Sequence, residues 1–349
     1  MACGDACNHS SPAFRESPSD QSGGTRPARE SWLPVPNREA LMTLFITHSA
    51  CGEHLTPPGH PERPERLRAI EQVLAHEKFP FLLREQCPRA ELETVALCHP
   101  WEHIERIRTA VPQMGLVQLD DDTVLSAGSF EASLRAAGGA ILAVDEVMSG
   151  KAKNAFVAIR PAGHHAESTT AMGFCLFNNA AIAVRHAQRR YGAERVAIVD
   201  FDAHHGNGSQ QIFWSDRTVM YCSTHEMPLF PGTGEWSECG EYNNVVNVPL
   251  RAGDGGETFR EALYFAILPR LQNFSPDLIV ISAGFDAHRL DPLANLKLSE
   301  ADFGWATHKI MEIADLRSAG KVISVLEGGY ALESLASSVA AHVTALMES

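Results

Sequence analysis

The stretch VAIVDFDAHHGNG, residues 196–208, decides the fold because a short apolar run ends directly in acidic and histidine side chains. An uninterrupted apolar run of this length is typical of a strand that is buried on both faces of a parallel sheet. Ligands of open parallel sheets bind beyond the carboxyl ends of the strands. We therefore expect residues 196–201 to form a central strand whose end carries a functional site.

Similar apolar runs recur outward along the chain, and helical patterns separate them. Residues 130–148, for example, place apolar side chains at spacings of three and four, as one face of an amphipathic helix requires. This alternation predicts an α/β fold in which a single parallel sheet carries helices on both faces. The further strands are expected at 41–47, 155–160, 219–223, 278–282 and 322–326, and the further helices at 178–191, 258–271, 300–314 and 332–347.

Residues 1–40 differ from the rest of the chain in composition. They are rich in Ser, Pro, Gly and charged residues and show no apolar periodicity. A segment of this kind cannot bury enough apolar surface to fold, so we expect a flexible N-terminal tail. Neither an internal repeat nor a long linker follows it. The sequence therefore predicts one catalytic domain over residues 41–349.

Composition and charge narrow the classes of function. The 349 residues include 29 Lys and Arg against 43 Asp and Glu, a formal net charge of −14, and no basic cluster that would bind nucleic-acid phosphates. The sequence contains neither a run of 18 apolar residues nor a signal peptide. Its eight cysteines are scattered without a CxxC pair. We expect a cytoplasmic protein that binds neither nucleic acid nor membranes.

Polar clusters also follow three other predicted strands. RPAGHHAE occupies residues 160–167, SAGFDAH occupies 282–288, and EGGY occupies 327–330. The carboxyl ends of parallel strands lie at the same edge of a sheet. The four clusters are therefore expected to converge on one pocket.

Asp202, His204 and Asp286 are the candidate metal ligands. Residues two apart in an extended segment point to the same side, so the first two face together. Three carboxylate or imidazole ligands with an open position are typical of a catalytic zinc site. In the structural alternative, the aspartates cap helices and the histidine packs in the core.

A two-metal hydrolase is the sharpest competing interpretation. Arginase-like sites hold their second ion with extra carboxylates at Asp-x-His-x-Asp and Asp-x-Asp spacings. Gly206 stands two residues after His204, and His288 stands two residues after Asp286. Because the bridging carboxylates are missing, the sequence favours one metal ion.

His164 and His165 are the candidate general base and general acid. Each ring needs a partner on its other nitrogen, and Asp200 and Asn207 are available for this purpose. An aspartate would raise the pKa of its histidine, whereas an asparagine would only orient the ring. The alternative is a surface histidine pair that follows a Pro-Ala-Gly turn.

Tyr330 follows Gly328 and Gly329, which permit a close backbone approach. Its phenol is a candidate hydrogen-bond donor to the oxyanion of a tetrahedral intermediate. Phe174 and Phe230 lie on predicted loops and are candidates for the walls of a narrow tunnel. An ordinary turn and ordinary core packing are the alternatives for these residues.

Six motifs together resemble the zinc-dependent histone deacetylase superfamily, most closely its class II-like deacetylases and the bacterial histone deacetylase-like amidohydrolases. They occur in the family's order over about residues 43–345. The resemblance implies the arginase/deacetylase fold, with a parallel sheet of about eight strands. The motifs are RPAGHHAE, GFCLFNNAAIA, VAIVDFDAHHGNGSQ, PGTGEW, SAGFDAH followed by DPLANL, and LEGGY.

The resemblance also implies the roles of the site residues. It implies one zinc ion bound by Asp202, His204 and Asp286. The histidine pair would handle protons, with His165 as the general base, and Tyr330 would polarise the scissile carbonyl. The residues implied to bind substrate are Gly173, Phe174, Phe230, Leu293, Gly328 and Gly329.

Potassium is the other cofactor that the resemblance implies. A structural potassium ion would lie near Asp200, Asp202, His204, Ser223 and Thr224. A second one would lie near Phe213, Asp216, Val219 and Tyr242.

The predicted function is hydrolysis of the amide of an acylated amine, with an acetyl-lysine-like substrate. One alternative is a deacylase of small-molecule amides such as acetylpolyamines. Leu293 is apolar where polyamine-selective relatives carry an acidic gatekeeper, which disfavours this alternative. Another is a module that binds acylated ligands without turnover. The charges of HPERPERL, residues 60–67, are expected to form a solvated face at the rim of the pocket. The sequence leaves open whether the protein forms a homo-oligomer.

Overall fold

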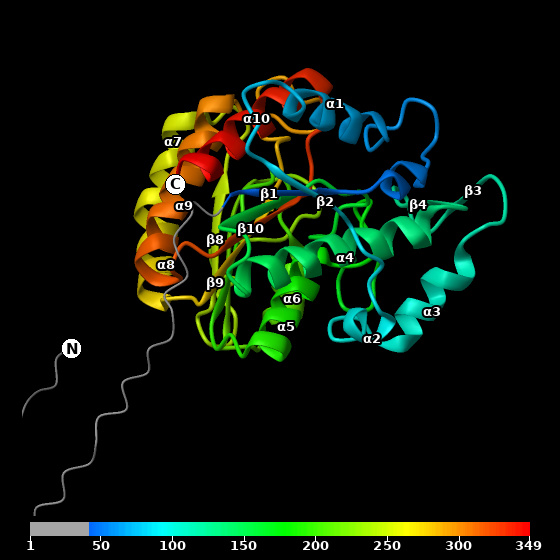
Figure 1. Cartoon of the computed structure of the whole chain (residues 1–349), viewed down its shortest axis with the longest axis horizontal. Coiled ribbons are helices and arrows are strands. Elements are labelled where there is room, and N and C mark those ends of the chain that lie inside the picture. The colour runs from blue at the N-terminus through cyan, green and yellow to red at the C-terminus, as the bar shows by residue number, and fades with distance from the viewer. Residues whose placement is uncertain (1–41) are drawn as a thin grey trace, which may run out of the picture. The chain divides into compact units, whose positions relative to one another are not determined.

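A computed structural model describes residues 42–349, so the tail predicted over residues 1–40 lies outside the described residues. The described part contains one sheet of eight parallel strands in the order β2-β1-β5-β10-β9-β6-β7-β8. Figure 1 shows helices on both sides of this sheet, which confirms the predicted α/β architecture. The strands are β1 (Leu44–Thr47), β2 (Leu83–Gln86), β5 (Asn154–Val157), β6 (Val196–Asp200), β7 (Val219–Glu226), β8 (Val245–Leu250), β9 (Leu278–Ala283) and β10 (Val322–Leu326).

The helices divide between the two faces. α4 (Ser129–Met148) packs with α5 (Asn179–Tyr191) on one face, and α9 (Glu300–Arg317) packs with α10 (Leu332–Glu348) on the other (Figure 1). Within residues 42–349, no helix is long and apolar enough to cross a bilayer. The remaining helices are α1 (Glu65–Leu74), α2 (Leu92–Val95), α3 (Trp101–Ala110), α6 (Asn207–Phe213), α7 (Gly256–Ala262) and α8 (Leu268–Phe274), with a 3₁₀ turn η1 (Ser49–Glu53) and a π-helical turn η2 (Leu263–Ile267).

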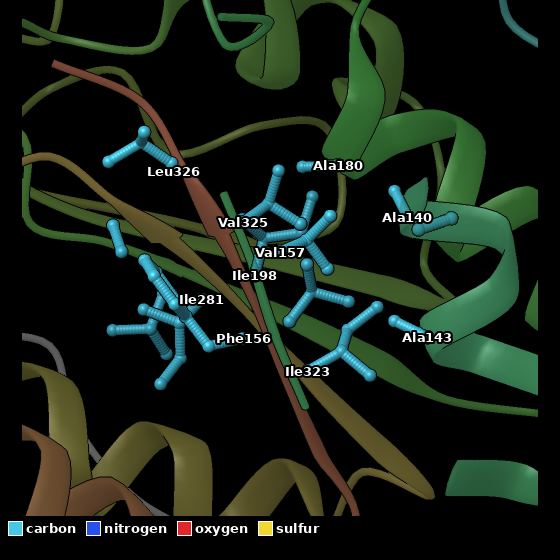
Figure 2. Packing of buried hydrophobic residues seen from close by; sticks show 14 of the residues in the cluster. Ala140, Ala143, Phe156, Val157, Ala180, Ile198, Ile281, Ile323, Val325 and Leu326 are labelled. Atoms are coloured by element: carbon cyan, nitrogen blue, oxygen red, sulfur yellow. The ribbon is translucent and has the colours of Figure 1, made fainter. Parts of the chain in front are cut away.

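The two-sided core explains why the central strands are mostly apolar. Successive side chains of a strand leave the sheet in opposite directions. Val157 and Val325 lie on the same side of the sheet as Ala140 of α4, whereas Phe156 lies on the other side (Figure 2). There the ring centroid of Phe156 lies 5.5 Å from that of His342 in α10. Both faces are buried, so the sequence of each central strand has no polar alternation.

The predicted strands form the middle of the sheet, and the sequence prediction missed both edges. β2 has the sequence LREQ and is mostly exposed, so it contains no apolar run. β8 includes Pro249, whose missing N–H is tolerated because the strand has a single neighbour. The antiparallel hairpin of β3 (Leu116–Gln118) and β4 (Val124–Ser126) was also missed. Edge and hairpin strands lack the uninterrupted apolar run that identified the central strands.

The helix predicted at residues 258–271 is longer and irregular. It runs as α7, η2 and α8, from Gly256 to Phe274. Pro269 lies in the first turn of α8 and has no N–H to give to the preceding turn, which coincides with the widened π turn. The other predicted helices differ from the observed ones by three residues or fewer at each end.

Candidate active site

The four polar clusters meet at one edge of the sheet, as predicted. They follow β5, β10, β9 and β6, which are four consecutive strands in the sheet order. Their side chains come from parts of the chain as far apart as residues 164 and 330. The order of the strands therefore brings the clusters into one site.

Asp202, His204 and Asp286 offer ligand atoms that all lie within 4.8 Å of one another, and all three residues are buried. His204 Nδ1 lies 2.8 Å from Asp286 Oδ2 and 3.2 Å from Asp202 Oδ1. Burial disfavours the charged imidazole, yet these two carboxylates raise the pKa of His204 well above its ordinary value. Two buried carboxylates that face one imidazole require a positive charge between them, and a divalent metal ion fits this donor set.

Gly328 makes room for these ligands. A Cβ at this position would lie 2.4 Å from Asp286 Oδ2 and 2.6 Å from Asp202 Oδ2. The Gly328 N–H donates to Asp202 Oδ2 at 2.8 Å. Any larger residue would displace the two carboxylates. Gly328 and Gly329 were predicted to bind substrate, whereas the structure places Gly328 behind the ligands and directs the Gly329 carbonyl toward Arg66 Nε at 2.6 Å.

His164 and His165 are buried, and their ring centroids lie 4.0 Å apart. His164 Nδ1 lies 3.0 Å from Asp200 Oδ2, and His165 Nδ1 lies 2.9 Å from Asn207 Oδ1. These are the partners that the sequence suggested. The surface alternative for the pair is wrong, because the two residues are only 2% and 5% exposed.

The two histidines have opposite electrostatic surroundings. Burial opposes protonation of His164, but Asp200, Asp202 and Glu327 raise its pKa to about 10. Burial, together with the neighbouring His164 and His204, lowers the pKa of His165 well below its ordinary value. These surroundings favour the charged form of His164 and the neutral form of His165.

A cavity of about 250 Å³ opens onto these groups. His165, His204 and Tyr330 form its polar end, and the predicted Gly173, Phe174, Phe230 and Leu293 line its walls. Asp122 and Leu229 also line it, and the sequence prediction missed both. Asp122 is one of three consecutive aspartates in a turn, and no spacing distinguishes it from its neighbours.

The turn between β3 and β4 supports one wall of the cavity. The Gly173 N–H donates to Asp122 Oδ1 at 3.1 Å, and the Phe174 N–H donates to Thr123 Oγ1 at 3.2 Å. Gly173 has a φ of +57°, and a Cβ there would lie 2.5 Å from His165 Cδ2. The glycine thus lets the wall approach the histidine closely.

The expectation that the charges of HPERPERL form a solvated face is wrong for Glu62 and Arg66, although the Glu65 side chain is exposed. Glu62 and Arg66 are fully buried. Arg160 Nη2 donates to Glu62 Oε2 at 2.5 Å, and Arg66 Nη2 donates to the Glu327 carbonyl oxygen at 2.5 Å. Arg66 also lies over the Tyr330 ring, 4.9 Å from its centroid. The segment joins the loops that carry the histidine pair and the tyrosine.

The two implied potassium positions differ in how well the residues fit. At the first, Asp200 pairs with Ser223 across β6 and β7, and the Thr224 hydroxyl is buried with no partner among the described residues. A buried oxygen with no protein partner is a suitable ligand for a cation that binds oxygen.

At the second position, the side-chain amide of Asn244 already donates to the implied ligands. Asn244 Nδ2 lies 2.9 Å from the Phe213 carbonyl oxygen, 3.2 Å from that of Asp216 and 3.0 Å from that of Val219. The Arg217 guanidinium lies over the ring of Tyr242, the fourth implied residue. Each of these carbonyl oxygens keeps a second lone pair that could bind a cation, so the second ion stays a prediction.

Comparisons with known proteins agree with this geometry. A family model described as histone deacetylase domain matches residues 60–346. The chain is 38% identical to a probable deacetylase of Archaeoglobus fulgidus over 84% of this chain and 82% of that protein. It is 37% identical to a histone deacetylase-like amidohydrolase of Pseudomonas aeruginosa over 80% and 75%. The crystal structure of the HDA15 HD domain matches with a TM-score of 0.84 and 35% identity over 88% of each chain.

Proposed function

The chain belongs to the histone deacetylase family and is a hydrolase that acts on amides. On this premise we propose that it uses one zinc ion to deacylate an acetyl-lysine-like substrate. The observation that carries the proposal is the buried group of Asp202, His204 and Asp286 at the end of a cavity with apolar walls. Its fold is the arginase/deacetylase fold.

Three ligands with an open position support a catalytic zinc ion, which when bound lowers the pKa of water and polarises a carbonyl. His165 accepts the proton of the attacking water, because its pKa is low and Asn207 occupies its other nitrogen. The Tyr330 hydroxyl donates a hydrogen bond to the acyl oxygen as negative charge develops there. The leaving amine takes a proton from the histidine pair, which yields a carboxylate and a free amine.

The walls of the cavity support a linear acyl-amine substrate. Phe174, Phe230 and Leu293 present apolar surface along the 250 Å³ cavity. The stem of an acylated lysine is apolar and would bury against them. Asp122 is the only carboxylate in this lining besides the metal site, and it would attract a distant ammonium group. Acetylpolyamines therefore remain the second candidate substrates.

A panel of substrates tests this choice. Acetyl-lysine peptides, acetylputrescine, acetylspermidine and simple anilides are compared by kcat/KM with the zinc-loaded protein. We expect the acetyl-lysine peptides to give the highest values. An advantage of orders of magnitude for the acetylpolyamines would contradict the interpretation of Leu293. Stoichiometric zinc without hydrolysis of any substrate would favour the non-catalytic binding module.

The ligand assignment has a separate test. Asp286→Ala is expected to abolish stoichiometric zinc, as measured by elemental analysis of the purified protein. Asp315→Ala removes an exposed aspartate far from the sheet end and serves as the matched control. Full zinc content in Asp286→Ala would contradict the assignment.

We also propose one structural potassium ion at Asp200, Asp202, His204, Ser223 and Thr224. The unpaired Thr224 hydroxyl is the supporting observation. An ion that binds only the folded protein raises its stability by mass action, so the Tm should rise with potassium concentration at constant ionic strength. Equal Tm values in potassium and in tetramethylammonium salts would contradict this site.

The cytoplasmic location stays a prediction, which the six free cysteines of the described part favour.

A further inference from the structure

Asn207 does not hold His165 alone, because a carboxylate holds its amide in turn. Asn207 Nδ2 donates to Glu167 Oε1 at 2.9 Å and lies 3.4 Å from Met172 Sδ. Asn207 Oδ1 lies 2.9 Å from His165 Nδ1. We propose that Glu167 is a positioning residue that sets the orientation and tautomer of His165 through Asn207.

The chemistry of the amide makes Glu167 the deciding group. An amide presents an acceptor oxygen and a donor nitrogen of nearly the same shape, so Asn207 could face His165 with either end. A carboxylate accepts hydrogen bonds and donates none. Glu167 therefore requires the Nδ2 end, which leaves Oδ1 for His165.

The oxygen of Asn207 then selects one tautomer of the histidine. It accepts a hydrogen bond only from a protonated Nδ1. Neutral His165 thus keeps its lone pair on Nε2, on the side of the ring away from Asn207. His165 lines the substrate cavity, so this is the tautomer that a general base needs. If the amide were reversed, its donor end would favour the other tautomer.

The backbone around Glu167 fixes this arrangement. The Ser209 N–H at the start of α6 donates to the His164 carbonyl oxygen at 3.1 Å. A Cβ at Gly208 would lie 2.2 Å from the Ala166 carbonyl oxygen, so the helix touches the histidine segment directly. The first turn of α6 and the segment that ends in Glu167 are therefore in direct contact.

Glu167 can be changed without opening the core. Together with Asn207 it lines a second cavity of about 430 Å³, which is separate from the substrate cavity that His165 lines. Glu167 is half-buried, whereas Asn207 is buried. A substitution at Glu167 therefore alters the chain of hydrogen bonds and leaves the packed residues in place.

The same geometry explains the choice of asparagine over aspartate at position 207. An aspartate there would bring two carboxylates to within about the 2.9 Å that now separates the amide nitrogen from Glu167. Like charges at this distance oppose each other strongly. Glu167 and Asn207 therefore form a matched pair, and the effect of a change at one depends on the other.

The test combines turnover with a spectrum, because the inference rests on the proposed function. Hydrolysis of an acetyl-lysine peptide by the unaltered protein is measured first, and failure at this step counts against the proposed function. Long-range ¹H–¹⁵N spectra of histidine-labelled protein report the tautomer of His165 whether or not the peptide is hydrolysed, and His165→Ala assigns the signal. The two failures are thus distinguishable.

Four variants give the expected pattern. Glu167→Ala should lower kcat about tenfold or more, a part of the ~10²–10⁴ that a positioned base contributes, and should leave KM within about twofold. Its spectrum should show loss of the protonated Nδ1. Glu167→Gln keeps an acceptor oxygen and should stay within about threefold of the unaltered kcat. Asn207→Asp should have a low kcat, because its carboxylate would face that of Glu167. Adding Glu167→Gln should raise this kcat, because the introduced amide at position 167 can donate to the introduced carboxylate at position 207.

Glu194→Gln is the control, since it removes the same charge from an exposed glutamate remote from the site. Unaltered kcat and an unaltered spectrum in Glu167→Ala would overturn the inference. It would also be overturned if Glu167→Gln slowed Asn207→Asp further, since a residue with a merely structural role gives no such reversal.

Discussion

His164 and His165 are adjacent in the sequence, but the charges around their two rings differ. On one side, His164 faces the carboxylates of Asp200 and Glu327. On the other, His165 faces the neutral amide of Asn207. Burial acts on both rings in the same direction, yet their pKa values move in opposite directions. The charges around each ring, rather than the residue type, therefore give the two histidines opposite pKa shifts.

Removal of each ring tests this difference most directly and should have the largest effect. His165→Ala is expected to lower kcat by about 10²–10⁴, because it removes the proposed general base at the end of the cavity. His164→Ala should lose less, because His165 keeps its place and its partner. Turnover of a saturating acetyl-lysine peptide, with zinc content checked, gives the comparison. Equal losses in the two variants would mean that the rings share one role.

Tyr330 provides the next test, because it supplies the remaining hydrogen-bond donor at the end of the cavity. Tyr330→Phe should lower kcat by about 10²–10³, the usual cost of one oxyanion donor. The phenylalanine keeps the packing against Arg66 and Phe174, so KM should change little. Near-full activity in a steady-state assay would mean that a protonated His164 alone can stabilise the oxyanion.

The negative charge of Asp200 beside His164 can be removed while the imidazole ring is kept. Asp200→Asn deletes a carboxylate that raises the pKa of His164, so this pKa should fall. A group with a lower pKa loses its proton at lower pH, and activity that needs the protonated ring is lost with it. The alkaline limb of kcat against pH should therefore move to lower pH by about one unit or more. Suppose instead that the alkaline limb of Asp200→Asn lies at the same pH as that of the unaltered protein and that kcat at lower pH is preserved. This result would show that protonated His164 is not required.

The smallest effect on turnover is expected from a change at Glu62. This residue contacts the segment of the histidine pair only through Arg160, which donates to its carboxylate. Glu62→Gln leaves two buried guanidinium groups without their carboxylate and should cost about 3–5 kcal/mol of unfolding free energy. Glu65→Gln, on the exposed pair with Arg68, should cost about 0.5 kcal/mol or less. Urea titrations measure both.

The loss at Glu62 should also depend on pH. Burial opposes ionisation, but Arg160 lowers the pKa of Glu62 to about 2. A carboxyl group whose pKa is lowered by folding stabilises the protein above its ordinary pKa of 4.5. That contribution is lost as the pH falls toward 2. Equal stability losses at pH 7 and near pH 3 would contradict the ion pair as the cause.

Local pattern was sufficient to predict the middle of the fold. Strands covered on both faces, such as β6 and β9, are apolar up to their last one or two residues, and this run is visible in the sequence. The metal-ligand candidates were visible for a similar reason, because Asp202 and His204 follow such a strand two residues apart. The edge strand β2 was missed because it is mostly exposed, and β8 was missed because Asn247 and Pro249 interrupt its apolar run.

The cavity wall and the supporting contacts could not be predicted in this way. Asp122 lies in a run of three aspartates, and only the packing of the β3–β4 turn against Gly173 brings it to the cavity. Glu167 follows the histidine pair in sequence, but its partner Asn207 comes from another element. No periodicity marks a residue whose only task is to hold another residue.

The sequence alone therefore determined the α/β class, the strand ends that carry the chemistry and the residue types that bind a metal ion, because these depend on spacing within one segment. The tertiary structure alone decided which charges are buried. Glu62 and Arg66 read as solvated in HPERPERL, yet both are fully buried. The reason is Arg160, 98 residues away from Glu62, whose guanidinium neutralises the carboxylate. A buried charge is tolerated only beside its partner, and the fold decides where that partner stands.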